Sequence, residues 1–461
     1  MTSSLDLKVS GAETRHAARA SAADGADPIL DTIGVGFGPA NIALAIANSE
    51  LPEPLTMAFV EANPGPTWQA GMLIDGSDIQ HNPLRDFVTP RNPCSPYGYL
   101  SYLKSCGRLF KFLNLDAPFP PRSDYAEYVR WVADHFRDHV HYSQRVSAIS
   151  LSDELDPGMG RRLVRVETED RSFRARSLSF APGRSKNVPP LFQSLLGDRV
   201  FHFTDYVRWR DEWRKEGAPA SVAVIGSSQS AVEILLDMHA LLPETTLHSV
   251  FRNFSYVLKD TSPFTEDLLF PSFTDYFYGA SRESRRQLTE QVLRSNYGSV
   301  DHDVLKKLYF VLYEDEVRGD ESIVVRNNTL VSEAEVDEGG VRLMLRDVHT
   351  GDTGVLRVDA VILATGFRNF GLADNEELCH PLLGEVVGAY EADEDGTPLV
   401  TRSYQLVPAE GDATAPPVFL NGLCEASHGL GDAGSFSLLS YRSFEILRAL
   451  ESALVGSMVL R

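Results

Sequence analysis

The sequence predicts an α/β fold with two Rossmann-like dinucleotide-binding domains, the second inserted into the first. A β-branched strand, a glycine-rich turn and a small apolar helix follow one another at residues 31–48, and the same order returns at 221–235. An apolar strand that ends on glycine follows each unit, at 177–183 and at 358–367. Because each such strand can close a parallel sheet, we expect one domain to interrupt the other.

Composition and charge narrow the class of protein. The 461 residues carry a formal net charge of −21, which argues against nucleic acid or an anionic membrane surface as a partner. The four cysteines form no C-x-x-C pair, so we expect no disulfide framework and no metal site, and a reducing cytoplasm is the expected location. No apolar run has the length of a membrane span, so no membrane association is expected.

The first strand–turn–helix unit has the features of a pyrophosphate site. Gly36 permits the tight turn, Gly38 lets the backbone approach a phosphate, and the helix that follows presents free N–H groups. Asn41 replaces the third glycine of the usual G-x-G-x-x-G pattern. Glu61 ends the next apolar run and can accept hydrogen bonds from an adenosine ribose. These residues predict an FAD site.

A long connection rich in glycine, proline and asparagine follows at residues 63–96. Irregular segments of this length in compact domains are often binding segments, and this one contains aromatic, amide and arginine side chains. Two amphipathic helices are predicted after it, at 95–103 and at 123–136, the second capped by Ser123.

The second unit differs from the first at two positions that bear on its ligand. Ser228 stands where the second glycine is expected, and the following strand, 246–251, ends in Arg252 instead of an acidic residue. A carboxylate at that point favours a free 2′-hydroxyl, whereas an arginine can pair with a 2′-phosphate. We therefore expect NADP at this unit, in the form of NADPH.

The rest of the chain completes the two domains. An aromatic-rich insert at 260–296 precedes a helix at 300–314 and strands at 322–325 and 341–345. The Gly/Ser-rich stretch 427–440 ends in a helix whose N-terminus is expected to face the pyrimidine side of the flavin.

These observations predict the following domain organisation. Residues 1–28 form a disordered tail, 29–217 the first part of the FAD domain with a substrate segment at about 63–110, 218–358 the NADPH domain with its aromatic insert, and 359–461 the second part of the FAD domain.

Several short motifs in this order resemble the flavin-dependent N-hydroxylating monooxygenases, which are the ornithine and lysine N-monooxygenases of siderophore pathways. The motifs lie at 34–41, 67–72, 92–96, 99–103, 226–233, 363–367 and 428–430. The resemblance implies an enzyme that uses FAD and NADPH, takes a small amine and O₂ as substrates, and assembles as a homo-oligomer, a tetramer or a dimer.

The resemblance also implies a reaction. In that family NADPH reduces FAD, the reduced flavin captures O₂ as a C4a-hydroperoxide, and the neutral primary amine of the substrate attacks the distal oxygen. The cofactor supplies the chemistry, so no side chain is required as a covalent catalyst.

Site residues follow from the motifs and from this resemblance. We expect cofactor contacts at Gly34, Gly36, Gly38, Asn41, Glu61, Trp68, Gln69, Gln80, Val146, Gly226, Ser228, Gln229, Ser230, Arg252, Asn296, Tyr297 and Gly366. The positions that bind the amino-acid substrate correspond to Arg85, Glu266, Asn296 and Ser437.

Two of these positions depart from the family pattern. Arg85 replaces the usual lysine, and Glu266 stands where the family commonly has Asn or, in some members, Asp. Arginine is a flat, two-pronged ligand for carboxylates. It can hold the α-carboxylate of ornithine or lysine, or a second carboxylate on a shorter substrate such as aspartate, whose α-amine would be oxidised iteratively to a nitro group. A diamine is a further alternative.

Other classes are also compatible with two nucleotide units. One is a flavin monooxygenase that oxidises a ketone, in a Baeyer–Villiger reaction, or a sulfur. Another is a flavin-binding protein without catalysis, although it would have no need for a second unit with an arginine suited to NADP. A dithiol reductase is disfavoured because the chain has no cysteine pair to relay electrons.

Overall fold

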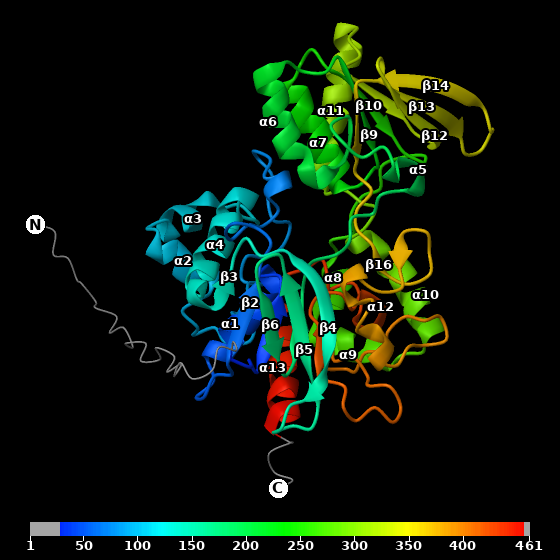
Figure 1. The fold of residues 1–461 in the computed structure, drawn as a ribbon. Coiled ribbons are helices and arrows are strands. Elements are labelled where there is room, and N and C mark those ends of the chain that lie inside the picture. Colours follow the sequence, from blue (N-terminus) through cyan, green and yellow to red (C-terminus); the bar gives the residue numbers. More distant parts are fainter. Residues whose placement is uncertain (1–27, 456–461) are drawn as a thin grey trace, which may run out of the picture.

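The computed structural model describes residues 28–455. The predicted tail therefore lies outside the described residues, except for Pro28. Two α/β units stand one above the other in Figure 1, and irregular segments of the chain connect them.

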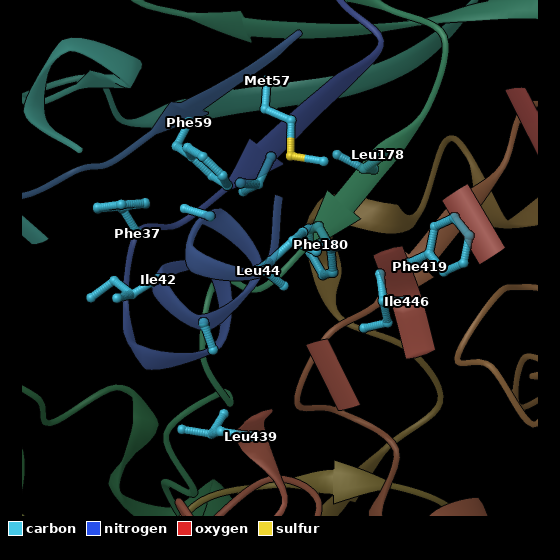
Figure 2. Packing of buried hydrophobic residues seen from close by; sticks show 14 of the residues in the cluster. Phe37, Ile42, Leu44, Met57, Phe59, Leu178, Phe180, Phe419, Leu439 and Ile446 are labelled. Carbon is cyan, nitrogen blue, oxygen red and sulfur yellow. The ribbon is translucent and has the colours of Figure 1, made fainter. Parts of the chain in front are cut away.

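The lower unit is built on a five-stranded parallel sheet in the order β18-β7-β1-β2-β3. Helix α1 (Pro39–Ser49) follows β1 and packs against the C-terminal helix α13 (Leu439–Val455). Leu44 of α1, Phe180 of β7 and Ile446 of α13 belong to one buried cluster, so the two ends of the described chain share a core (Figure 2). The strands are β1 Thr32–Val35, β2 Met57–Val60, β3 Val140–His141, β7 Leu178–Phe180 and β18 Val418–Leu420.

An antiparallel sheet and three helices complete the lower unit. The sheet consists of β4 Val146–Leu155, β5 Arg162–Thr168 and β6 Ser172–Ala175, and the helices are α2 Tyr99–Ser105, α3 Leu109–Leu115 and α4 Arg122–Asp134. The predicted cap at Ser123 is wrong. Pro121 is the N-cap of α4, because its extended backbone sets the start of the helix one residue earlier than predicted and places Ser123 inside the first turn.

The upper unit is a second five-stranded parallel sheet, in the order β11-β10-β9-β15-β8. Helices α6, α7 and α11 pack on it through one core, while a three-stranded antiparallel meander packs through another. The elements are α5 Pro190–Gln193, β8 Val200–His202, α6 Tyr206–Glu216, β9 Ser221–Ile225, α7 Gln229–Leu241, β10 Thr246–Val250, α11 His302–Arg318, β11 Ile323–Arg326, β12 Thr329–Asp337, β13 Gly340–Asp347, β14 Thr353–Val358 and β15 Ala360–Leu363.

The pairing of strands in this sheet differs from both predicted domain boundaries. β8 and α6 lie before residue 218, and β15 lies after residue 358, yet β8 and β15 pair with each other and α6 packs in the same core. The second unit therefore includes sequence on both sides of the predicted limits. A strand that ends on glycine signals closure of a sheet, but it does not say to which sheet the strand belongs.

The aromatic insert also lies elsewhere than predicted. Its helices α8 (Pro263–Glu266), α9 (Pro271–Gly279) and α10 (Arg282–Val292) lie in the lower half of the molecule, where α9 and α10 contact α12 (Glu425–His428) (Figure 1). The Tyr278 hydroxyl donates a hydrogen bond to the Val400 carbonyl. Of the aromatic side chains in the insert, Phe277 is buried and the Tyr278 ring lies 5.1 Å from the His428 ring, whereas Phe264, Phe270 and Tyr276 are exposed. The insert is therefore held to the C-terminal segment by a few contacts of α9.

The remaining elements are short. They are β16 Asn369–Phe370 and β17 Glu376–Glu377, with the single-turn 3₁₀ helices Ala70–Met72, Arg137–His139, Phe203–Asp205, Asp267–Leu269, Leu293–Ser295, Pro381–Leu383 and Val387–Ala389. A buried ion pair between Arg122 of α4 and Glu233 of α7 joins the two units, with N–O distances of 2.9 and 2.8 Å. No described helix is long and apolar enough to cross a membrane.

Candidate active site

The turn after β1 has the shape that a pyrophosphate requires. Gly36 has φ +80°, and a Cβ there would collide with the carbonyl oxygen of Ala181, so only glycine fits. A Cβ on Gly38, in contrast, would meet nothing within 4 Å. Gly38 is also the N-cap of α1 and no side chain caps that helix end, which leaves N–H groups free for an anion. The residues present therefore fit a dinucleotide such as FAD.

Glu61 lies at the end of β2 beside this turn. Its carboxylate accepts hydrogen bonds from the Phe37 backbone N–H at 2.8 Å and from the Asn63 backbone and side-chain N–H groups at 2.8 and 2.7 Å. These bonds fix the carboxylate at the carboxyl edge of the sheet, where the ribose of a dinucleotide binds.

Two predicted cofactor residues are committed to the protein interior instead. A Cβ on Gly34 would collide with the ring of Phe59, so this glycine makes room for a core side chain. The fully buried Asn41 amide donates to the Gly36 carbonyl at 2.7 Å and accepts from the Ser179 hydroxyl at 2.7 Å. Asn41 therefore supports the turn from behind.

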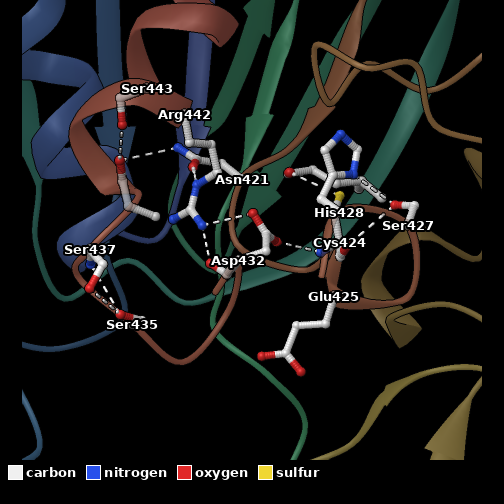
Figure 3. A network of polar contacts seen from close by, with 12 residues as sticks. Asn421, Cys424, Glu425, Ser427, His428, Asp432, Ser435, Ser437, Arg442 and Ser443 are labelled. Carbon is white, nitrogen blue, oxygen red and sulfur yellow. Dashed lines mark hydrogen bonds and ion pairs between the residues drawn. The ribbon is translucent and has the colours of Figure 1, made fainter. Parts of the chain in front are cut away.

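A buried polar network continues from Asn41 through Asn421 into the C-terminal segment. Figure 3 shows the part of it around Asn421, Asp432 and Arg442. Arg442 of α13 donates to the Asn421 side-chain oxygen at 3.0 Å and pairs with Asp432 at 2.9 Å, and both charged groups are fully buried. The other Asp432 oxygen accepts the Cys424 backbone N–H at 2.6 Å. The network fixes the loop that leads to the predicted substrate residue Ser437.

The turn after β9 repeats the geometry of the first. Gly226 has φ +138°, and a Cβ there would collide with the carbonyl oxygen of Ala364, just as Gly36 meets Ala181. Ser228 is the N-cap of α7 in extended conformation without a side-chain cap, and Ser230 lies in the first helical turn. The Gln229 backbone N–H donates to the Ser299 carbonyl at 3.0 Å, but no side chain caps this helix end, so the second unit fits NADP through the remaining N–H groups of the turn.

The Gln229 side chain is occupied within the protein. It donates to Glu233 at 2.9 Å and accepts from the Asp301 backbone N–H at 2.9 Å, so its amide supports the helix instead of a ligand. Gly366, after β15, has φ +77° and open space where a Cβ would lie, as a close approach of cofactor to backbone requires.

Arg252 lies two residues after the end of β10, at the position predicted for the 2′-phosphate. Its side chain is exposed, and within residues 28–455 no hydrogen bond or ion pair engages it. The guanidinium is therefore available to an incoming phosphate at the carboxyl edge of the second sheet.

Gln80 occupies a strained backbone position on the segment between the units. Its φ is +59°, and its amide nitrogen is buried with no hydrogen-bond partner in the described structure, while its amide oxygen lies 3.5 Å from the Lys259 ammonium. Strain and an unpaired buried donor are features of ligand-binding positions. The observation fits the predicted contact with the flavin ring.

An aromatic wall adjoins Gln80. Trp68, Tyr125 and His81 gather around Phe436, with ring centroids 5.1 to 5.5 Å from it, and His81 stacks on Phe436 at an interplanar angle of 13°. Burial lowers the pKa of His81 to about 4, so its ring is neutral near pH 7. Trp68 was predicted from the sequence; the contributions of His81, Tyr125 and Phe436 depend on tertiary packing and carried no local signal.

Two other predicted FAD residues lie apart from each other: Gln69 directly precedes the 3₁₀ helix Ala70–Met72, which contacts α6 of the upper unit, whereas Val146 begins a strand of the lower unit. Gln69 is exposed, with φ +49°, and Val146 is the partly buried first residue of β4.

The two predicted substrate residues that depart from the family pattern contact each other. Arg85 and Glu266, 181 positions apart in sequence, form an ion pair with an N–O distance of 2.6 Å, and both side chains are partly exposed. Arg85 comes from the long connection and Glu266 from α8, so the displaced insert brings one to the other.

The remaining predicted substrate residues, Asn296 and Ser437, lie near a single loop. Asn296 is exposed, and its amide nitrogen would lie 3.0 Å from a Cβ on Gly434, three residues before Ser437. The buried Ser437 hydroxyl accepts a hydrogen bond from the Ser435 hydroxyl at 3.0 Å.

Tyr297 belongs to a buried cluster that sequence reasoning missed. Its hydroxyl donates to Glu425 at 2.6 Å and accepts from Arg184 at 2.6 Å, while Asn369 donates to the second Glu425 oxygen at 2.7 Å. Burial raises the pKa of Glu425. Arg184 and Asn369 lie on the two linkers between the units, so the cluster connects both linkers to α12. Only the position of Arg184, directly after a strand and glycine, could have drawn attention to it.

Comparison with known proteins agrees with this geometry. Residues 28–369 match the family model described as L-lysine 6-monooxygenase/L-ornithine 5-monooxygenase. The chain is 35% identical over 415 residues to the L-ornithine N(5)-monooxygenase of Burkholderia cepacia, covering 87% of this chain and 90% of that protein.

Solved structures agree as well. The ornithine hydroxylase of Pseudomonas aeruginosa superposes with a TM-score of 0.83 at 32% identity, over 93% of this chain and 100% of that one. The ornithine N-hydroxylase of Kutzneria sp. 744, in a complex with reduced FAD, NADP⁺ and L-ornithine, gives 0.84 at 30% identity, over 92% and 99%. The chain therefore belongs to the L-lysine 6-monooxygenase/L-ornithine 5-monooxygenase family, a family of FAD- and NADPH-dependent enzymes that hydroxylate amines.

Proposed function

We propose that this enzyme hydroxylates the distal primary amine of an α-amino acid, L-ornithine or L-lysine, with NADPH and O₂. The observation that carries the proposal is the ion pair between Arg85 and Glu266, two positions that the family resemblance implies for substrate binding. The pair places one positive and one negative group side by side on a partly exposed surface.

Such a pair complements the zwitterionic end of an amino acid. Arg85 can bind the α-carboxylate through two N–H groups, and Glu266 can accept hydrogen bonds from the α-ammonium. On binding, the substrate α-carboxylate replaces Glu266 as the partner of Arg85, and the α-ammonium replaces Arg85 as the partner of Glu266. Neither protein charge is therefore left without a counter-charge.

The same charges disfavour the two alternatives. The second carboxylate of aspartate would lie close to the Glu266 carboxylate, and the second ammonium of a diamine would lie close to the Arg85 guanidinium. Like charges at short distance in a partly desolvated site oppose binding. Arg85 therefore replaces the family lysine without changing the class of substrate.

The protein's part in the reaction is to bind, orient and dehydrate the reactants. The two glycine turns hold the dinucleotides, and Arg252 selects the 2′-phosphate. Bound flavin supplies the oxygen activation. The reacting amine must be neutral, and deprotonating a group of pKa about 10.4 near neutral pH costs roughly 4 kcal/mol, so an apolar surrounding favours the reactive form. The wall of Trp68, His81 and Phe436 provides such a surrounding beside Gln80.

Removal of the negative charge tests the assignment. Glu266→Gln should raise the KM for ornithine or lysine at least about tenfold, because a charge-assisted bond to the α-ammonium is replaced by a neutral contact. FAD content and the KM for NADPH should stay unchanged. Glu290→Gln, on the exposed face of α10, is the matched control. An unchanged KM for the amino acid in Glu266→Gln would contradict the proposal.

A further inference from the structure

Helix α11 of the upper unit carries a row of apolar side chains on its solvent side. Tyr309, Phe310, Tyr313 and Val317 are 74%, 60%, 58% and 70% exposed. Their spacing of one, four and eight residues places them on one face of the helix. We call these four residues the α11 ridge.

The opposite face of α11 already has a partner. Leu308 is buried, and the helix packs beside α7 in the upper unit (Figure 1). The ridge is therefore a second apolar face, which a helix that covers only its own sheet does not need. Single exposed apolar residues are ordinary, but a contiguous row of three aromatic rings and a valine marks an interaction surface.

Two charged residues border the ridge, one near each end. Lys306 lies on the same face towards the N-terminus of the helix, and Glu316 lies towards its C-terminus. Neither forms an ion pair within residues 28–455, whereas Lys307 pairs with Asp303 and Arg318 pairs with Asp315. The face thus has a free positive group at one end and a free negative group at the other.

This arrangement is complementary to itself when reversed. If two copies of α11 lie antiparallel about a twofold axis at the level of Val311, Lys306 of one copy lies opposite Glu316 of the other, because the two residues are equally far from the axis. Tyr309 lies opposite Tyr313 by the same rule, and Phe310 lies next to its own symmetry mate. A surface that matches itself in this way is what an isologous twofold interface requires.

We propose that the α11 ridge is the contact between two copies of this chain, paired antiparallel about a twofold axis. At about 200 Å² for each aromatic side chain, the three rings alone expose roughly 400 Å² per copy. That is about half of the 800 Å² that each partner buries in an interface of standard size. The valine and the bordering charged residues enlarge the contact, and the free charges fix its direction.

Charge reversal and mixing test the geometry in the FAD-loaded full chain. Lys306→Glu alone places a new carboxylate opposite Glu316, and Glu316→Lys alone places a new ammonium opposite Lys306. Each variant should therefore raise the dissociation constant of the homodimer at least about tenfold, as like charges at an interface do. An equimolar mixture of the two variants should pair again, since every contact then joins opposite charges. Sedimentation velocity measures the dimer dissociation in each of the two variants and in their equimolar mixture. Lys215→Glu, exposed on α6, is the matched control for net charge and should leave the dimer intact.

Three results would overturn the proposal. The first is a wild-type chain that stays monomeric at about 50 μM, a concentration well above the dissociation constants of stable dimers. The second is an assembly that neither charge reversal weakens, which would place the contact on another surface. The third is a mixture of the two variants that stays dissociated. Because all these residues are exposed, circular dichroism should show that every variant remains folded.

Discussion

The Arg85 side chain is the residue on which the substrate argument depends. Arg85→Ala should leave FAD bound and NADPH oxidation running towards peroxide release, while hydroxylated product falls. Loss of a charge-assisted contact in a partly desolvated site costs about 2–4 kcal/mol, or roughly 30- to 1000-fold in kcat/KM. Arg85→Lys should restore most of the activity if an α-carboxylate is bound, because lysine keeps the positive charge and is the residue that the family resemblance implies at this position. Chromatography of the hydroxylated product together with NADPH consumption measures both variants. An Arg85→Ala enzyme as efficient as wild type would place Arg85 outside the site.

Arg252 decides between the two nicotinamide cofactors. It is exposed after β10 and free of protein partners among the described residues, so its guanidinium can engage the 2′-phosphate, which NADH lacks. Arg252→Ala should raise the KM for NADPH by about tenfold or more and change that for NADH little. Steady-state kinetics with both cofactors measures the difference, and equal effects on the two would remove the role of Arg252.

The role of a residue could be predicted from the sequence where it belongs to a short local motif. The role was harder to predict where it depends on contacts with residues distant in the sequence. Gly36, Gly38 and Glu61 could be identified because a strand–turn–helix needs them at fixed spacing. Asn41 could not be interpreted correctly, because its amide bonds residues as distant as Asn421. A neighbour hundreds of positions away leaves no pattern in the local sequence.

At the scale of elements, α13 is held to the site loop by one buried ion pair. Arg442→Ala would leave Asp432 buried without its counter-charge, which costs about 3–5 kcal/mol of unfolding free energy. Arg448→Ala on the same helix removes an exposed arginine and should cost less than about 0.5 kcal/mol. Urea unfolding followed by tryptophan fluorescence compares them. Similar losses in both variants would contradict the importance of the buried network.

The order of elements could be predicted more closely than their ends. Both strand–turn–helix units and the NADP-side strands occur where the sequence indicates them. The helix predicted at 95–103 begins at Tyr99, and the cap predicted at Ser123 is at Pro121. The ends of helices depend on backbone contacts outside the helix, and these have weak sequence signals.

At the scale of the whole molecule, several buried histidines set the acid limit of stability. Burial lowers the pKa of His81, His202, His248 and His428 to about 4, whereas the unfolded value is about 6.5. The unfolded chain therefore binds more protons between these values, so the stabilisation is full above about pH 6.5 and is lost as the pH falls towards 4. Urea midpoints across this range should decline, and His428→Gln should flatten the decline. A midpoint that is independent of pH in this window would contradict the buried neutral state.

The arrangement of the two units is the part that sequence patterns described least well. The number of units and the insertion of one into the other follow from repeated motifs. The assignment of β8 and β15 to the same sheet, and the docking of the aromatic insert on α12, depend on tertiary contacts. That docking brings Glu266 to Arg85, the pair to which we assign substrate binding in our proposal.

The identity of the amine that the enzyme hydroxylates decides whether the Arg85–Glu266 pair binds an amino acid. The most direct measurement is mass-spectrometric product analysis of the purified enzyme with NADPH and O₂, with ornithine, lysine, putrescine and aspartate in parallel, and with NADPH consumption recorded for each. We expect ornithine or lysine to gain one oxygen on the distal amine, with NADPH use coupled to product. Putrescine and aspartate should mainly give uncoupled oxidation. Efficient hydroxylation of aspartate or of the diamine, without activity on ornithine and lysine, would contradict the assignment of the Arg85–Glu266 pair to a zwitterionic amino acid.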